Sequence, residues 1–286
     1  MATGKANDMV TGAKKISVAI AGINGRMGRA AVSALLADDD FEVVGAFGRS
    51  GAAYVGKDLS TFVSPHLEKA SGVKVSDSFE AMLAECGEKP DVLLDNMIAA
   101  ASFESAKKAL KAGIRPVIGT SGLQPEMVDE LSKMAASAKL GGMIVPNFSI
   151  GAVLMMDFAK QAGKYFGNVE VVEMHNPKKV DAPSGTAMHT LNKIASNGSH
   201  FNPKMVEEHE LIPHARGGLH ASGVRVHSLR MPGPISHQDV LFAGEGEMLT
   251  IRHDSFTTSC FIKGIILAIK SAVQMSELKV GLETVL

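Results

Sequence analysis

The fold of this chain is decided by residues 16–28, ISVAIAGINGRMG, close to its amino terminus. Residues 16–21 form a short apolar run that is typical of a buried strand. Residues 29–37 carry apolar side chains at helical spacing, so the three glycines form a turn between a strand and a helix. Gly22 permits the tight turn, Gly25 lets a pyrophosphate approach the backbone, and Gly28 lets the helix pack closely on the strand. The stretch predicts a dinucleotide site.

The glycine spacing is GxxGxxG rather than GxGxxG, so glycines that serve only the geometry of the turn are the alternative interpretation. A second predicted strand, residues 41–47, ends in Gly48-Arg49-Ser50. NAD-selective sites usually place a carboxylate there to bind the ribose 2′-hydroxyl. This chain has none, and Arg49 offers a fork of donors suited to a 2′-phosphate. The sequence therefore favours NADPH, with NADH possible; a solvated loop cation is the alternative for Arg49.

Further strands are predicted in the apolar runs that begin at residues 91, 115 and 142, and helices over residues 103–112 and 124–139. Strands that alternate with helices indicate an α/β fold with a parallel sheet and helices on both faces. Ligands of such sheets bind beyond the carboxyl ends of the strands. The glycine turn, Arg49, Asp95, residues 119–121 and residues 146–148 all follow predicted strands, so we expect them to gather at one edge.

A second group of functional residues lies just past the middle of the chain, in residues 173–186, EMHNPKKVDAPSGT. An apolar strand brings His175 to its end, a polar loop carries Lys178, Lys179 and Asp181, and residues 183–186 predict a helix start. A proton donor, a cation and a helix N-terminus together suit a small anionic substrate. A histidine without chemistry is the alternative for His175. We expect Asp181 to orient the loop by pairing with a lysine, and Glu173 to be structural.

The remaining residues predict a second, α+β domain for substrate binding and oligomerisation, with a mixed or antiparallel sheet. Helices are expected over residues 151–166 and 186–195, and strands over residues 224–230, 237–242 and 247–253, which we interpret as an antiparallel meander. A last helix over residues 261–273 is expected to return to the first domain. The predicted boundaries are a flexible tail at 1–14, a dinucleotide-binding domain at 15–149, the second domain at 150–254, and a C-terminal segment at 255–286.

Composition excludes several function classes. The chain has 286 residues and a formal net charge of −1, so no charge excess points to nucleic acid or a membrane surface. No apolar run is long enough to span a membrane, and residues 1–15 do not form a signal peptide. The two cysteines lie far apart without metal-ligand spacing. We therefore predict a cytoplasmic protein without a metal.

Four motifs occur in order: GxxGRMG at residues 22–28, GTSG at 119–122, PNFS at 146–149, and ExHxxxKxDAPSGTA at 173–187. Together they resemble the 4-hydroxy-tetrahydrodipicolinate reductase (dihydrodipicolinate reductase) family, which acts in the diaminopimelate route to lysine. The resemblance runs from about Lys15 to the C-terminus, and the last motif is highly specific. It implies an NAD(P)H-dependent oxidoreductase, a small cyclic dicarboxylate as substrate, and a homotetramer joined through the sheets of the second domains.

The resemblance implies that His175 is the catalytic proton donor, with Lys179 beside it. Substrate binding is assigned to Asn176, Gly185, Thr186 and Ser121. The residues expected to bind the cofactor are Gly22, Ile23, Asn24, Gly25, Arg26, Met27, Arg49, Gly119, Thr120, Ser121, Val145, Pro146, Asn147 and Phe148. Three departures from the family pattern stand out: Asn176 replaces a frequent second histidine, Asn96-Met97 replaces Phe-Thr, and Gly48 replaces the acid at the end of the second strand. A dinucleotide-binding sensor or scaffold without activity, and a related imine or aspartate-type dehydrogenase, are the alternatives.

Overall fold

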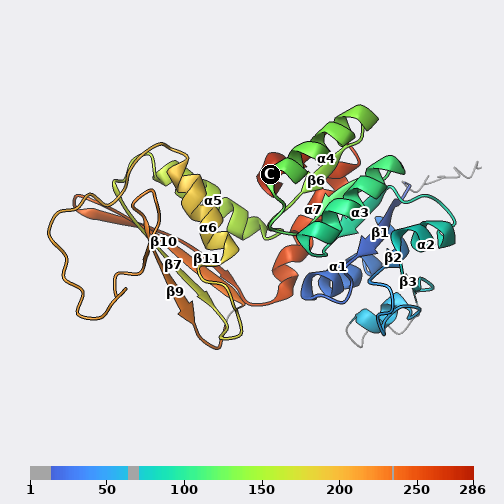
Figure 1. Cartoon of the computed structure of the whole chain (residues 1–286), viewed down its shortest axis with the longest axis horizontal. Helices are drawn as coiled ribbons and strands as arrows, with labels where there is room; N and C mark the ends of the chain where they lie inside the picture. Colours follow the sequence, from blue (N-terminus) through green and yellow to red (C-terminus); the bar gives the residue numbers. More distant parts are fainter. Residues whose placement is uncertain (1–13, 64–70, 234) are drawn as a thin grey trace, which may run out of the picture.

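The computed structural model describes residues 14–63, 71–233 and 235–286 of the chain. The predicted tail at residues 1–14 lies outside the described residues except for Lys14. Figure 1 shows two lobes side by side along the long axis of the molecule. One lobe contains the blue and green N-terminal half and the red C-terminal helix, and the other contains the yellow and orange strands.

The first lobe is built on a seven-stranded sheet in which every pair of neighbouring strands is parallel. In spatial order the strands are β12 (Leu278–Val280), β6 (Gly142–Ile144), β5 (Arg115–Ile118), β4 (Val92–Asp95), β1 (Ile16–Ala21), β2 (Phe41–Phe47) and β3 (Val75–Ser76). Without β12, this is the strand order of a Rossmann fold, whose direction of winding reverses between β1 and β4. The predicted parallel α/β sheet is confirmed, and β3 and β12 are strands that the sequence analysis did not predict.

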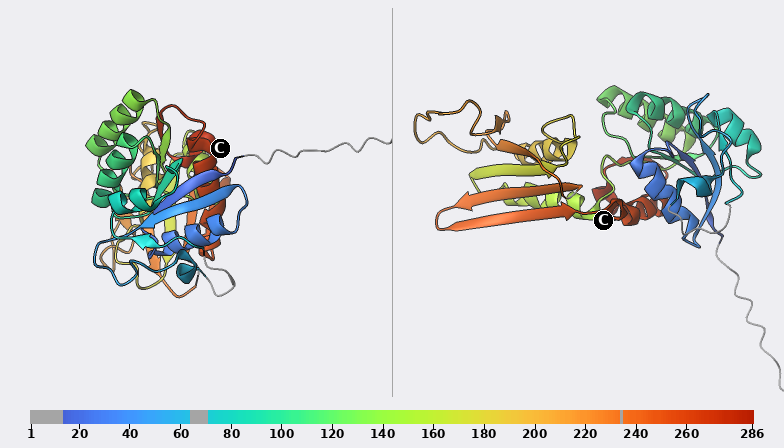
Figure 2. Two further views of the ribbon diagram at one scale, coloured as in Figure 1. Left: turned by 90° about the vertical axis from the view of Figure 1, so that its right-hand side faces the viewer. Right: turned by 90° about the horizontal axis from the view of Figure 1, so that it is seen from below.

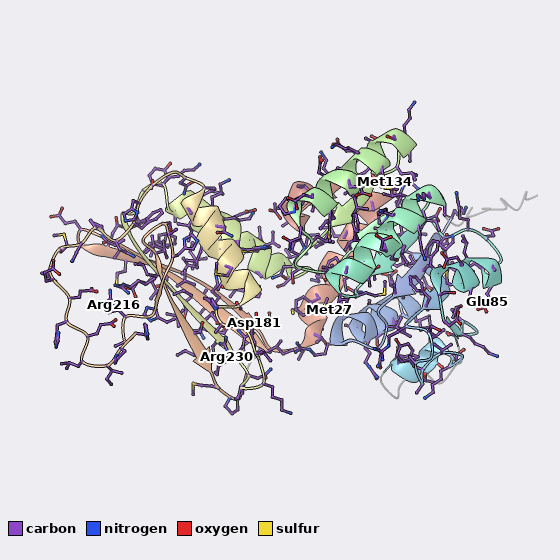
Figure 3. The ribbon with its side chains drawn as sticks, viewed as in Figure 1. Met27, Glu85, Met134, Asp181, Arg216 and Arg230 are labelled. Atoms are coloured by element: carbon purple, nitrogen blue, oxygen red, sulfur yellow. The ribbon has the colours of Figure 1, made fainter. Side chains whose placement is uncertain are left out.

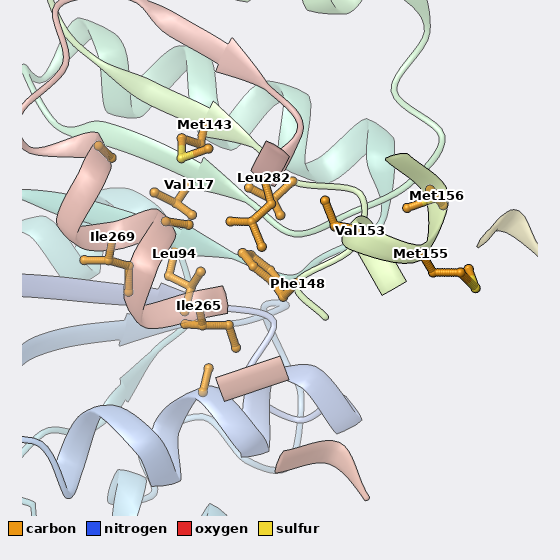
Figure 4. Packing of buried hydrophobic residues seen from close by; sticks show 14 of the residues in the cluster. Leu94, Val117, Met143, Phe148, Val153, Met155, Met156, Ile265, Ile269 and Leu282 are labelled. Atoms are coloured by element: carbon orange, nitrogen blue, oxygen red, sulfur yellow. The ribbon is translucent and has the colours of Figure 1, made fainter. Parts of the chain in front are cut away.

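Helices cover both faces of this sheet because the strands are apolar on both sides. Helices α1 (Arg26–Leu36) and α7 (Ile262–Ala272) share one core with Ile20, Leu94 and Val117. Helices α3 (Ala99–Lys111) and α4 (Pro125–Ala138) pack with Ile118 and Ile144 on the other face, and α2 (Phe79–Glu85) packs with Leu93. Figure 4 shows the α7 side, where Ile265 and Ile269 lie against Leu94 and Val117.

The second lobe contains a five-stranded mixed sheet in the order β11 (Glu247–Ser255), β10 (Ser236–Gly244), β7 (Asn168–His175), β9 (Arg225–Arg230) and β8 (Gly218–Leu219). The predicted antiparallel meander is wrong in one respect. Strands β10 and β11 form the expected hairpin, but β9 does not pair with β10. Strand β7 lies between them and runs parallel to β9. The error arose because the buried strand β7 takes the central position, a tertiary preference that local spacing does not encode.

One face of the mixed sheet packs on helices α5 (Ile150–Ala162) and α6 (Gly185–Ala195). Along β7 this face is apolar at Val169 and Val171, which pair with Phe242 and Val240. It becomes polar towards the end of the strand. Glu173 pairs with Gln238 and Ser228, and His175 pairs with Ser236 and Arg230. Because opposed residues in a sheet point to the same face, the polar side chains form one group at this end.

The chain passes between the lobes at two places, after β6 and after β11. Helix α7, β12 and the short 3₁₀ helix Leu282–Val285 then return to the first lobe. Figure 2 shows the red C-terminal segment beside the blue strands and helices of the N-terminal half. Lys193 on α6 bonds both Asp157 on α5 and Glu283 near the C-terminus, at 2.5 and 2.7 Å. The two lobes are therefore connected by the C-terminal end of the chain as well as by its middle. No helix of the described residues is long and apolar enough to cross a membrane.

Candidate active site

A cleft of about 670 Å³ lies where the two lobes meet. From the first lobe it is lined by Arg26, Met27 and Gly119, and from the segment that connects the lobes by Pro146, Asn147 and Phe148. From the second lobe it is lined by His175, Asn176, Lys179 and Thr186. Figure 3 shows Met27 on one side of this junction and Asp181 and Arg230 on the other. Ten residues predicted from the sequence to bind cofactor or substrate therefore line one cleft.

The glycine turn after β1 has the shape of a phosphate cradle. Gly22 has a φ of +74°, and a Cβ on it would lie 2.6 Å from the carbonyl carbon of Asn96. Gly25 is the N-cap residue of α1, and no side chain there caps the first N–H groups of the helix. A Cβ on Gly25 would contact only the backbone oxygen of Gly22, at 3.6 Å. The N–H groups of Arg26 and Met27, the first of α1, have no acceptor among the described residues. Because a helix N-terminus attracts anions, these residues fit the pyrophosphate of a dinucleotide.

The other predicted cofactor residues fall into two groups. Asn24, Arg49 and Ser121 are exposed, and Thr120 is half-buried. The side chains of Ile23 and Val145 are fully buried in the hydrophobic core. Only the backbone of these two residues is available to a ligand. Asn96 lies directly behind Gly22, beside Gly119 and Phe148, so the Asn96-Met97 departure from the family pattern belongs to this side of the cleft.

His175 is held by a buried carboxylate. Its Nδ1 lies 2.5 Å from Oε2 of Glu173, whose side chain is fully buried, while the imidazole itself is 15% exposed. Arg230 donates to both Glu173 oxygens, at 3.0 and 3.2 Å. Burial by itself would raise the pKa of Glu173, but bonds from His175, Ser228 and Arg230 outweigh it and lower the pKa to about 2. The carboxylate is therefore ionised, Nδ1 is the bonded nitrogen, and Nε2 is left for a ligand.

The loop after His175 presents a cation and a helix N-terminus. Lys179 Nζ donates to Asp181 at 2.7 Å, which confirms the expected pairing of Asp181 with a lysine. This bond is the main cause of the lowered pKa of Asp181. Ser184 caps α6 by accepting from the N–H of Ala187 at 3.1 Å. The N–H groups of Gly185 and Thr186 are left without an acceptor among the described residues, and a Cβ on Gly185 would meet nothing within 4 Å. This arrangement suits a carboxylate.

The amide of Asn147 connects the predicted cofactor and substrate residues, and the amide of Asn176 lies in the substrate loop. Asn147 donates from Nδ2 to the Thr186 hydroxyl at 3.3 Å, and its Oδ1 accepts from the N–H of Ser149 at 2.8 Å. Asn176 accepts from the N–H of Lys178 at 2.9 Å through Oδ1. The Nδ2 group of Asn176 can therefore still donate where the family often has a second histidine. The structure thus brings the two predicted groups of residues to opposite walls of one cleft.

Comparison with known proteins agrees with this geometry. The family model described as dihydrodipicolinate reductase, N-terminus, matches residues 16–148, and the C-terminus model of the same family matches residues 151–286. The chain belongs to the dihydrodipicolinate reductase family. It is 40% identical over 277 residues to the 4-hydroxy-tetrahydrodipicolinate reductase of Synechococcus elongatus, covering 96% of this chain and 100% of the relative. It is 41% identical over 271 residues to that of Geobacillus kaustophilus, covering 95% and 99%.

Among solved structures, the chain resembles a dipicolinate-bound dihydrodipicolinate reductase from Paenisporosarcina sp. TG-14. The two share 38% identity with a TM-score of 0.82, over 96% of this chain and 100% of the other. An amine dehydrogenase from Mycobacterium smegmatis is 16% identical with a TM-score of 0.63, over 91% and 93% of the two chains, which shows a shared fold alone. The reductase resemblance stated from the four motifs is confirmed.

Several contacts in this reductase site were not predicted from the sequence. Arg230 donates hydrogen bonds to Glu173 and, at 2.8 Å, to the backbone oxygen of Asp181. It therefore connects β7 to the loop that follows His175. His253 Nε2 lies 3.2 Å from the hydroxyl of Ser149, the N-cap of α5 between the lobes. Burial is the main cause of the lowered pKa of His253. The register of β7 with β9 reveals the first partner and the packing of α5 on β11 reveals the second, because the partners lie 57 and 104 positions apart in the chain.

Proposed function

We propose that this protein reduces 4-hydroxy-tetrahydrodipicolinate to tetrahydrodipicolinate in lysine and diaminopimelate biosynthesis, with NADPH as the preferred reductant and NADH as a possible one. The observation that carries this proposal is the buried Glu173 carboxylate under His175, in the same cleft as the glycine cradle. The family membership supports the reaction, and the residue roles below rest on the geometry of the cleft. A bound nicotinamide would supply a hydride from its C4.

His175 acts as the proton donor in this proposal. Glu173 accepts from Nδ1, which orients the ring and stabilises the imidazolium, and Nε2 carries the proton towards the cleft. For the product to be tetrahydrodipicolinate, the 4-hydroxyl group leaves as water, which creates a C=C bond conjugated with the C=N bond. A hydride from the bound nicotinamide would add to this conjugated system, and the proton goes to the atom that becomes electron-rich. Arg230 keeps the carboxylate in place, so it is a positioning residue rather than a proton carrier.

The substrate is held by its carboxylates. Lys179 provides a compact charge, and the N–H groups of Gly185 and Thr186 provide a second set of donors at the start of α6. Asp181 is 62% exposed, so its pairing with Lys179 is a weak surface ion pair that a substrate carboxylate can replace. Asn176 Nδ2 and, from the first lobe, Ser121 are proposed as further substrate contacts.

The cofactor is proposed to lie along the first lobe, with its pyrophosphate on the turn at Gly22–Met27. Gly119–Ser121 and Val145–Phe148 lie farther along the same sheet edge, and Arg49 at the end of β2 is exposed to solvent. An exposed guanidinium at a strand end whose residues 48–50 include no carboxylate favours a phosphorylated ribose. We also propose a cytoplasmic location.

A homotetramer is proposed for the assembly. Large apolar side chains are exposed on the second lobe, and self-association would remove them from water. They include Met205, Val206, Leu211, Ile212, Leu219 and Met248, which are between 67% and 89% exposed. Sedimentation of the purified chain at several concentrations tests this: a monomer at every concentration would contradict it.

The function is tested by following the loss of NADPH absorbance with the substrate and by repeating the assay with His175→Gln. We expect turnover by the wild type and a fall of about 10²-fold in kcat for the variant, with the fold kept, because the proton donor is removed. Dinucleotide binding without turnover in the wild type would favour the scaffold alternative. Turnover only with other imines would favour a related dehydrogenase.

A further inference from the structure

Tyr54, in the loop that follows β2, fills the space at the end of that strand where an NAD-selective site has a carboxylate. The ring of Tyr54 lies so close to Gly48 that a Cβ on the glycine would be 2.8 Å from the phenolic oxygen and 2.9 Å from Cζ. Any side chain at position 48 would therefore overlap Tyr54. NAD-selective Rossmann sites use an Asp or Glu at this strand end to bind the ribose 2′-hydroxyl. In this chain Tyr54 fills that space and places a neutral hydroxyl there instead.

The hydroxyl of Tyr54 is oriented as a donor. The backbone N–H of Arg49 donates to the phenolic oxygen at 3.2 Å, which uses an acceptor position of that oxygen. Within residues 14–63, 71–233 and 235–286, no group accepts the phenolic proton. The proton is therefore available to a ligand. Arg49 is exposed and its backbone N–H contacts the phenolic oxygen, so its guanidinium extends from the same end of β2.

The ring is also held in place from behind. Phe62 packs against Tyr54 edge to face, with the ring centroids 6.1 Å apart and the planes at 86°. Arg29 lies over the ring of Phe62 at 5.7 Å and bonds the side chain of Asn24 at 2.8 Å. A ring fixed by such contacts loses little conformational entropy when its hydroxyl binds a ligand. Tyr54 is therefore preorganised for a hydrogen bond.

We propose that Tyr54 is a specificity-determining residue that donates its hydroxyl proton to the 2′-phosphate of NADPH, beside the Arg49 guanidinium. This inference rests on the proposed function for the cofactor and adds the residue that selects it. A phosphate oxygen accepts a charge-assisted hydrogen bond, which is roughly twice as strong as a bond to the neutral 2′-hydroxyl of NADH. The hydroxyl therefore discriminates between the two dinucleotides even though it can contact both.

The test uses Tyr54→Phe, which keeps the ring and removes only the hydroxyl. Tyr165→Phe is the matched control, because Tyr165 is the second of the two tyrosines and is 85% exposed on the other lobe. Arg49→Ala is the positive comparison. Titration calorimetry measures the Kd of each protein for NADPH, NADH, adenosine 2′,5′-bisphosphate and adenosine 5′-monophosphate. The last two probes differ only in the 2′-phosphate, and none of the titrations depends on turnover.

We expect Tyr54→Phe to raise the Kd of NADPH and of the bisphosphate about 10-fold, the effect of one hydrogen bond to a charged group. The Kd values of NADH and of the monophosphate should change by about 3-fold or less, because the bond to the neutral 2′-hydroxyl is about half as strong. An unchanged Kd for NADPH, or an equal loss for both dinucleotides, would overturn the inference. If the wild type fails to reduce the substrate while the Tyr54→Phe pattern is seen, the proposed reaction fails and the role of Tyr54 stands.

Discussion

The substitution Glu173→Gln tests whether a buried carboxylate prepares His175 for proton transfer. Arg230 presents two donors to the two oxygens of Glu173, and His175 Nδ1 lies 2.5 Å from one of them. An amide offers one oxygen and one NH₂ group. Whichever way the amide lies, its NH₂ group faces either Arg230 or His175, so one of the present bonds is lost. The variant thus disturbs the orientation and charge of the imidazole while changing the side-chain volume very little.

Two effects of known size follow. A well-placed general acid contributes about 10² to 10⁴-fold in rate, so we expect kcat to fall about 10²-fold, with the Kd of NADPH unchanged. The pKa of Glu173 is about 2 in the folded protein against an ordinary value of 4.5. A carboxyl with a lowered folded-state pKa stabilises the protein above its unfolded-state pKa. In the wild type this contribution to the free energy of unfolding is about 3 kcal/mol at neutral pH and is lost as the pH falls through 4.5 towards 2. The Glu173→Gln variant lacks this contribution at every pH.

Steady-state kinetics and denaturant unfolding at several pH values measure both effects. The control is Glu170→Gln on the same strand, since Glu170 is also bonded to a histidine and an arginine, His227 at 2.7 Å and Arg216 at 2.9 Å, but faces a different pocket. We expect the control to lose stability and keep its kcat, with sedimentation confirming the same assembly. Equal kcat values for wild type and Glu173→Gln would refute the role given to Glu173.

Two further predictions concern the walls of the cleft. Lys179→Ala should lower kcat/KM about 10²-fold, mostly through KM, because a charge-assisted contact with the substrate is lost. The same variant should weaken dipicolinate binding measured by calorimetry. The control is Lys178→Ala, at an exposed residue, and equal effects of the two substitutions would argue against a specific role for Lys179. Gly22→Ala should cost about 3 kcal/mol of unfolding free energy, because its φ is +74° and a Cβ would overlap Asn96. Gly56→Ala has a φ of +80° with nothing within 4 Å and should cost only about 1 kcal/mol; equal losses would contradict the overlap.

The elements of the first lobe could be predicted because local pattern and tertiary position agree there. Apolar runs buried on both faces must be central strands, and the glycines mark the turn that a strand and a helix need. The short strand β3 and the C-terminal strand β12 escaped prediction because two- and three-residue strands carry almost no periodic signal. The position of β9 was also mispredicted, since strand order depends on which strand the helices α5 and α6 cover.

The amino-acid sequence by itself determined the residue types of the site and their places on the elements: a glycine turn after the first strand, His175 at a strand end, and Gly185 and Thr186 at a helix start. These are local features, set by spacing and turn chemistry. Tertiary structure decided which of them meet. The pairing of β7 with β9 places Arg230 against Glu173, and the packing of a tyrosine onto Gly48 places a donor beside Arg49. Such contacts depend on strand register and side-chain packing over long separations, and no local pattern specifies either.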